Sequence, residues 1–219
     1  MYSKTPLLAL ASIIALGLST GCVTGTRQLA VPTPTSASYP KDPSKGTVAI
    51  GPIRDVRHFE NKPDEPSIPS IDGDVTRLSD AARSTYIGRQ RNTYGHAMGD
   101  VALADGQTVP GKMSDLLREG LRRRGYEVVG AGQSPNVVTA DIQQFWSWMT
   151  PGAFVLTFEV QISCTVDFSR NGQPTTLAVK GYAKNHGQVA KDGNWNETFD
   201  EAFADFFSDL DHKMAAAGL

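Results

Sequence analysis

Arginine and tyrosine side chains are concentrated in one polar stretch of the chain, "ARSTYIGRQRNTYGHAMGD". The residues that we expect to carry binding here are Arg83, Tyr86, Arg89, Arg91, Tyr94 and His96. A guanidinium can donate two parallel hydrogen bonds to a carboxylate or a phosphate, and a tyrosine ring can stack on a sugar. The stretch therefore predicts contact with a partner protein, a lipid headgroup or a glycan. An ordinary solvated loop, or an added strand at the edge of a sheet, is the alternative.

Two tryptophans form a second candidate for partner binding. Trp146 and Trp148 end a predicted strand just before the turn sequence "TPGA". Exposed at the rim of a sheet, they would form an apolar patch of the kind that marks a binding site. The alternative is that both are buried aromatic residues of the core.

Patterns typical of metal or cofactor sites are not evident. The four histidines are scattered, and none has a partner at metal-binding spacing. In "VGAGQSP", Pro135 takes the place of the third glycine of a dinucleotide-binding turn. Cys164 alternates with apolar residues, which favours a small buried side chain over a nucleophile. We therefore predict no metal, no cofactor and no enzymatic activity.

Two other functional classes stay open as alternatives. An enzyme acting on cell-wall material would need carboxylates that converge in a concave pocket with raised pKa values. The candidates for that role are Asp72, Asp74, Asp100 and Asp105. Capture of a small ligand would instead need an apolar pocket in the sheet. The net charge of −2, without a strong basic patch, disfavours nucleic-acid binding.

The N-terminus predicts secretion and lipidation. Residues 7–18 are apolar, a run of 12 residues that is shorter than the roughly 20 needed to span a bilayer. This run is typical of the hydrophobic region of a signal peptide. It leads into "LSTGC", which resembles the lipobox of bacterial lipoproteins and implies acylation of Cys22 and cleavage before it. With Val23 rather than Asp after the cysteine, the resemblance implies an outer-membrane lipoprotein facing the periplasm.

Composition divides the chain into three parts. Residues 1–21 are the predicted lipoprotein signal peptide. Residues 22–45 follow, a lipidated cysteine and a Pro/Ser/Thr-rich tether that we expect to be disordered. Residues 46–219 suit one periplasmic domain, in which residues 55–109 form a long loop. Once Cys22 is acylated only Cys164 remains, so no internal disulfide is expected.

Alternating hydrophobicity gives the strongest structural signal. Apolar residues occupy every second position from Phe154 to Phe168, which predicts a strand with one buried face. Asn171-Gly172 predicts a hairpin turn into a returning strand at 175–187. Earlier strands are expected at 46–53, 126–130 and 136–146, and amphipathic helices at 109–125 and 196–214. The predicted fold is α+β, a single antiparallel-rich mixed sheet of four to five strands with two helices packed on one face.

These elements, together with the lipobox, resemble the YajG-like family of small envelope lipoproteins. The resemblance rests on "MSDLLREGLRRRGYEVVG", on the strand beginning "NVVTADI" and on the acidic last helix, and it covers roughly residues 112–214. It implies no enzymatic chemistry and supplies no site residues. The expected function is that of a membrane-anchored accessory protein that binds an envelope protein partner of a transport or assembly complex, or itself as a homo-oligomer.

Overall fold

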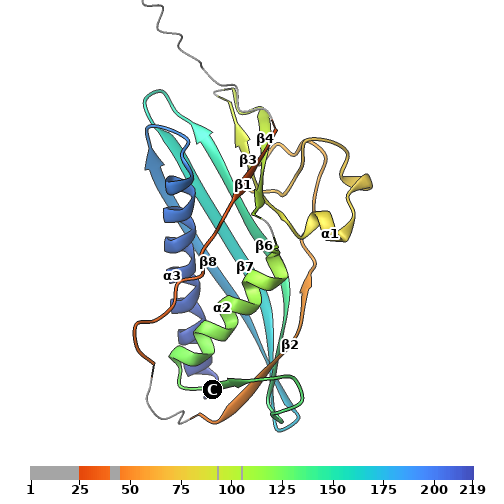
Figure 1. Cartoon of the computed structure of the whole chain (residues 1–219), viewed down its shortest axis with the longest axis vertical. Coiled ribbons are helices and arrows are strands. Elements are labelled where there is room, and N and C mark those ends of the chain that lie inside the picture. The colour runs from red at the N-terminus through yellow and green to blue at the C-terminus, as the bar shows by residue number, and fades with distance from the viewer. Residues whose placement is uncertain (1–24, 40–44, 93, 105) are drawn as a thin grey trace, which may run out of the picture.

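The computed structural model describes residues 25–39, 45–92, 94–104 and 106–219. The predicted signal peptide and Cys22 lie outside these residues, as does Asp105. The described residues form one mixed sheet of eight strands with three α-helices (Figure 1). No helix among them combines the length and the apolar character needed to span a membrane.

The element bounds are as follows. The strands are β1 (Gly25–Leu29), β2 (Thr47–Asp55), β3 (Tyr86–Arg91), β4 (Ala97–Leu103), β5 (Glu127–Val129), β6 (Val137–Pro151), β7 (Leu156–Arg170) and β8 (Gln173–Gly187). The α-helices are α1 (Asp80–Arg83), α2 (Val109–Arg123) and α3 (Asp192–Ala216), and a 3-10 turn, η1, covers Val75–Arg77.

Strand β6 is the centre of the sheet. β7 pairs antiparallel with one edge of β6 along its length, and β8 pairs with β7. The other edge of β6 is shared, because β2 pairs in parallel with residues 137–142 and β3 with residues 147–149. β5 continues the sheet beyond β2, while β4 and β1 continue it beyond β3. The sheet therefore divides along this edge into a β2–β5 branch and a β3–β4–β1 branch.

One end of the sheet collects several chain segments, and we call it the β1 end. β1 begins there at Gly25, beside the turn between β3 and β4. The β6–β7 turn at 152–155 and the loop at 188–191 between β8 and α3 lie at the same end. The C-terminus lies at the opposite end of the molecule (Figure 1).

The predicted hairpin of β7 and β8 is present. Asn171 and Gly172 both have positive φ, of 50° and 81°, which suits a two-residue turn with the twist of a hairpin. The alternating residues of β7 from Phe158 to Phe168 are buried as predicted. The prediction for Phe154 is wrong, because it precedes the first residue of β7 and is 94% exposed in the turn.

Helices α2 and α3 cover one face of the sheet (Figure 1). Thr108 caps α2 by accepting a hydrogen bond from the Gly111 amide, and Pro110 stands in the first turn, where its missing N–H costs nothing. α3 lies along β8 and β7 and buries a stripe of aromatic residues against them. Phe199 of this stripe stacks on Phe145 of β6 at 5.7 Å between ring centroids. The aromatic helix is thus core, as its spacing indicates.

The prediction of four to five strands and two helices is wrong. The additional strands β1, β3 and β4 lie in segments predicted to be tether or loop, and α1 is a helix of only four residues. These strands are short, and their sequences, GTRQL, YIGRQR and AMGDVAL, lack the alternation that reveals a half-buried strand. β3 and β4 pair with each other across a short turn, but β1 pairs with β4 and β3 with β6, which lie far away in sequence, so no local pattern predicts these pairings.

Residues 56–85, here called the cap, form a second small core on the opposite face of β6. Trp146 and Trp148 are buried there with Phe59, and Phe59 meets Trp146 edge-to-face at 5.8 Å between ring centroids. The Trp146 indole N–H donates to the Pro66 carbonyl, and that of Trp148 donates to Glu159. Both tryptophans therefore lie in the core rather than in an exposed patch at the rim.

Residues 25–39, predicted to belong to a disordered tether, are instead part of the domain. They supply β1 and then run along α2, where Leu29 and Val31 are buried. Glu119 of α2 holds the end of this segment by accepting hydrogen bonds from the Ser36 amide and the Tyr39 hydroxyl, both 2.7 Å long. The pairing of β1 with β4 and the contacts with Glu119 hold this segment in place, although its composition is typical of a disordered tether.

The carboxylate of Glu119 makes this attachment dependent on pH. Burial acts to raise its pKa, but hydrogen bonds from Tyr39, Arg123 and the Ser36 amide lower it further than burial raises it. A carboxyl group whose pKa is lower in the folded state stabilises the fold at neutral pH. That contribution is lost as the pH falls through the folded-state pKa, below the ordinary value of about 4.3.

We expect Glu119→Gln to lower the free energy of unfolding at neutral pH by about 2 kcal/mol, because it weakens bonds to three donors. Chemical unfolding followed from neutral to acid pH should show the two proteins converging as the wild-type carboxylate is protonated. A difference that stays constant over this range would show that the charge of Glu119 does not contribute.

Candidate functional site

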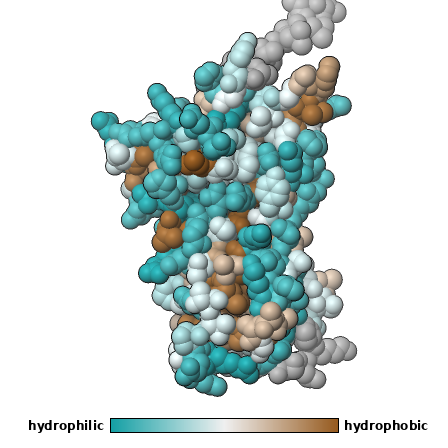
Figure 2. Space-filling view, turned by 180° about the vertical axis from the view of Figure 1, so that it is seen from behind, coloured by the Kyte–Doolittle hydropathy of each residue, from teal (hydrophilic) through white to brown (hydrophobic). Residues whose placement is uncertain are grey.

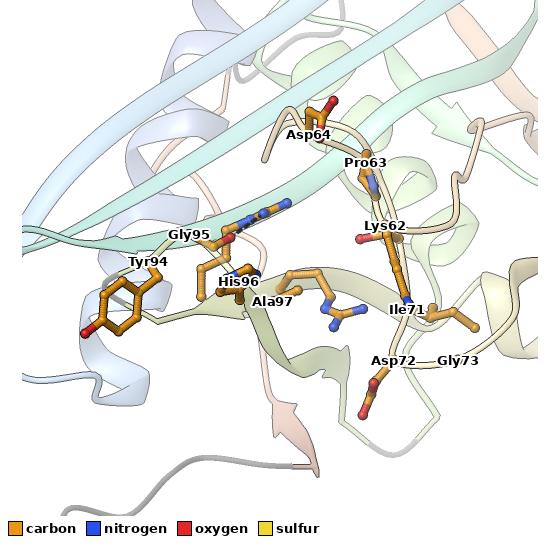
Figure 3. Close-up of a pocket in the computed structure, with 13 residues that line it drawn as sticks. Lys62, Pro63, Asp64, Ile71, Asp72, Gly73, Tyr94, Gly95, His96 and Ala97 are labelled. Carbon is orange, nitrogen blue, oxygen red and sulfur yellow. Dashed lines mark hydrogen bonds between the residues drawn. The ribbon is translucent and has the colours of Figure 1, made fainter.

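A cavity of about 570 Å³ lies between the cap and the β3–β4 turn. Figure 3 shows residues 62–64 and 71–73 of the cap on one side and residues 94–97 on the other. Lys62, Arg89 and Arg91 are its cationic lining residues, and it also contains carboxylates and a histidine. The remaining lining residues are Pro63, Asp64, Ser70, Ile71, Asp72, Gly73, Tyr94, Gly95, His96 and Ala97.

Strand β3 places the two arginines. Arg89 and Arg91 are two residues apart in the strand and both line the cavity. β3 lies tightly against β6 at Gly88, where an added Cβ would come within 2.4 Å of the Ser147 carbonyl oxygen. Only glycine allows this approach. The close packing fixes β3, and with it the arginines, against the rigid centre of the sheet.

Arg89 has a carboxylate partner. Its Nε lies 3.3 Å from the carboxylate of Asp100 on β4, and both side chains are almost fully buried. Burial raises the pKa of Asp100, while Arg89 and a hydrogen bond from the Asp72 amide partly oppose that shift. The positive charge of Arg89 is thus matched within the protein.

Arg91 has no such partner. Its guanidinium donates to the Gly95 carbonyl at 2.8 Å, but no described carboxylate lies within 4.0 Å of it and its Nε has no hydrogen-bond partner among the described residues. Arg91 is only 8% exposed, and burial together with the nearby charge of Arg89 lowers the pKa of Arg91. An arginine stays charged in proteins. The cavity therefore holds a cation whose charge no described side chain neutralises.

A second buried arginine shows how the same fold treats a structural guanidinium. Arg57 uses all of its donors, in two bonds to the Asp55 carboxylate and three to the carbonyls of Arg83, Tyr86 and Phe145, at 2.8 to 2.9 Å. A buried charge is normally paired and hydrogen-bonded in this way. Arg91 departs from that rule beside a cavity, and this departure is the reason to regard it as a binding residue.

The structure separates the predicted binding residues into two groups. Arg89, Arg91, Tyr94 and His96 line the cavity. Arg83 lies over the ring of Phe59 in the cap, while Tyr86, Trp146 and Trp148 belong to the second core. Cap residues Lys62, Asp64 and Ser70 also line the cavity and were not predicted, whereas Asp72 was predicted only as a carboxylate of the enzyme alternative. The charged, proline-rich sequence "ENKPDEPS" is the signal that could have indicated Lys62 and Asp64.

The acidic residues proposed for an enzyme do not all converge. Asp72 lines the cavity and its backbone amide bonds to Asp100, but Asp74 instead caps η1 through Thr76. Hydrogen bonds from Thr76 and Asn61 lower the pKa of Asp74. Within the described residues no group of three or more His, Cys, Asp and Glu side chains is arranged to hold a metal ion.

No protein-family model and no curated protein matches the sequence. Three solved structures are similar to the chain at low sequence identity and with TM-scores below 0.5. Protein XCC0632 of Xanthomonas campestris, of the family DUF330, is 10% identical over 88% of this chain and 96% of its own, with a TM-score of 0.49. An uncharacterized protein is 10% identical over 87% and 98%, with a TM-score of 0.43. Hypothetical protein CT253 of Chlamydia trachomatis is 12% identical over 78% and 98%, with a TM-score of 0.33.

Proposed function

We propose that this chain is a lipid-anchored protein of the outer membrane that faces the periplasm and binds an acidic group of another envelope component in the cavity beside Arg91. It acts by binding, as an accessory component of a transport or assembly complex, and not as an enzyme. The lipobox-like "LSTGC" supports the anchor, and kinship with YajG-like lipoproteins is part of the proposal.

The unneutralised guanidinium of Arg91 carries the binding part of the proposal. A carboxylate or phosphate entering the cavity would accept hydrogen bonds from it and neutralise its charge. A further polar atom of the lining, Ser70 Oγ, is buried without a hydrogen-bond partner among the described residues and could serve the same ligand. A neutral ligand would leave the charge of Arg91 unmatched, so the cavity favours an anion.

We expect anions to shift the NMR signal of the Arg91 side chain in a saturable manner. Inorganic phosphate, glycerol phosphate and acetate would each be titrated into the ¹⁵N-labelled full-length protein at constant ionic strength, and the arginine Nε–H signals followed. Arg91→Gln assigns the signal. It should also weaken binding by about tenfold or more, because a hydrogen bond to a charged group contributes about 1.5–3 kcal/mol.

Arg57 is the internal control, since its donors are already used within the protein. Its signal should stay in place while that of Arg91 moves. Equal, unsaturable shifts of both signals, or no shift of the Arg91 signal with any of the three anions, would contradict the binding proposal. The order of affinities among the anions distinguishes a phosphate ligand from a carboxylate ligand.

The alternative of a cell-wall enzyme has weaker support. It requires a carboxyl group with a raised pKa that is free to exchange a proton with a substrate. Asp100 has the raised pKa, but Arg89 and the Asp72 amide already engage its carboxylate. Its geometry is that of a charge partner for Arg89.

A further inference from the structure

Exposed apolar side chains gather at the β1 end of the sheet. Seven large apolar side chains are exposed among the described residues, and four of them, Tyr94, Phe154, Val155 and Val189, lie in the turns of this end. Scattered exposed apolar residues are ordinary in proteins, but a concentration at one end of a domain marks a contact surface.

The β6–β7 turn presents the most apolar part of this surface. Phe154 is 94% exposed and Val155 44% exposed, and a hydrogen bond of 2.7 Å from the Gly152 amide to the Val155 carbonyl closes the turn beneath them. Figure 2 shows the tip of this hairpin as an apolar projection from a largely hydrophilic face. Burying a phenylalanine contributes about 1.5–3 kcal/mol, and Phe154 gains none of this within the fold.

The chain length places a lipid anchor beside this turn. Cys22 precedes Gly25, the first residue of β1, by three positions, so the two Cα atoms are at most about 11 Å apart. β1 is fixed to the domain from Gly25 onward by pairing with β4, and Arg27 binds Asp192 at the start of α3 at 2.5 Å. An acylated Cys22 would therefore hold the whole β1 end against the headgroup layer, which is about 5–8 Å thick.

The charges of this end suit a lipid surface. The described residues of the turns at 92–97, 151–157 and 187–192 contain one acidic side chain, Asp192, which is paired with Arg27. Lys191 is the one lysine in these turns. The anionic headgroups of a bilayer repel free carboxylates and attract basic groups, so nothing in these turns opposes contact.

We infer that the β1 end is a lipid-contacting surface, which docks onto the membrane that holds Cys22 and inserts the β6–β7 turn into the boundary between headgroups and acyl chains. The inference rests on the lipid anchor of the proposed function. Phe154 and Val155 are the inserted residues, and Tyr94 lies at the level of the headgroups, where aromatic rings with a polar tip are favoured. The long axis of the domain then points away from the bilayer, with the C-terminus outermost.

The test places a fluorescent probe at each end of the acylated mature protein, which begins at Cys22. Phe154→Cys and, as the matched control at the far end, Gln173→Cys would be labelled with a polarity-sensitive dye. Burial raises the pKa of Cys164 to about 12, so this cysteine stays unlabelled. The proteins are reconstituted into vesicles of phosphatidylethanolamine and phosphatidylglycerol, with or without nitroxide-labelled lipid.

We expect the dye at position 154 to shift to the blue and to lose most of its emission to the nitroxide lipid, while the dye at 173 does neither. Identical behaviour of both probes would overturn the inference. Flotation of the vesicles separates this result from a failure of the anchor. Wild-type protein should float and Cys22→Ser should not, and a wild-type protein that stays in the dense fraction would refute the anchor itself.

Discussion

Arg57→Ala is expected to lower the free energy of unfolding by about 3–5 kcal/mol, the cost of breaking a buried, hydrogen-bonded ion pair. Its side chain is completely buried. The substitution would remove the five hydrogen bonds of the guanidinium, so the Asp55 carboxylate would keep only the bond from the residue 57 amide and three carbonyls would each lose a donor in the interior.

The place of Arg57 in the sheet explains why so much depends on it. β2 leaves the edge of β6 after residue 142 and β3 joins that edge at residue 147. In the gap between them neither β2 nor β3 pairs with Phe145, and the guanidinium of Arg57 donates to its carbonyl instead. It also ties the end of β2 to the start of β3 through Asp55 and Tyr86. One side chain thus joins the two branches of the sheet and closes the cap.

Chemical denaturation of the wild-type protein and of three variants tests this prediction. Arg54→Ala is the control, because Arg54 forms an exposed ion pair with Asp141 and such pairs contribute at most about 1 kcal/mol. Arg57→Lys should recover only part of the loss, since an ammonium cannot reproduce the planar fork. If the two alanine substitutions lower the free energy of unfolding equally, Arg57 does not hold the two branches of the sheet together.

The second large effect is expected at the contact between α3 and β8. An added Cβ at Gly181 would lie 2.3 Å from the Ala202 carbonyl oxygen and 2.9 Å from the Phe206 amide nitrogen. These are backbone atoms in the middle of a 25-residue helix, so no side-chain rotation relieves the clash. We expect Gly181→Ala to lower the free energy of unfolding by about 3 kcal/mol, at the upper end of what overpacking costs.

Gly193→Ala provides the matched control for this substitution. Gly193 lies in the first turn of α3, and an added Cβ there would meet nothing within 4 Å. The change should be neutral or stabilise the protein by less than about 1 kcal/mol, because alanine favours a helix more than glycine does. Thermal or urea unfolding of both variants is the measurement. A loss at Gly181 no larger than that at Gly193 would mean that α3 shifts freely on the sheet.

Local patterns were sufficient for the parts of the fold that are regular and half-buried. The hairpin of β7 and β8 was predicted because its residues alternate and Asn171-Gly172 favours one turn type. The two long helices were predicted because their apolar residues repeat at helical spacing. The same rule failed at Phe154, since alternation continues past the residue where the strand ends.

The candidate site was predictable only in part. The composition of the stretch around Arg89 and Arg91 indicated anion binding, and the structure places four of its predicted residues around one cavity. Sequence reasoning missed most of the opposite wall, because Lys62, Asp64 and Ser70 reach the cavity only through the folding of the cap over β6. It also gave no means of telling the structural Arg57 from the unneutralised Arg91, since that difference lies in their neighbours.

The sequence by itself determined the apolar faces, the tight turn and the long helices, because each depends on residues adjacent in the chain. Only the tertiary structure decided that residues 25–39 join the sheet, that Trp146 and Trp148 are core, and that Phe154 lies at the end where β1 begins. Each of these depends on pairing or contact between residues far apart in sequence. Such contacts form when the free energy gained from backbone hydrogen bonds and buried surface exceeds the entropic cost of closing long loops. A local sequence pattern gives no information about that difference.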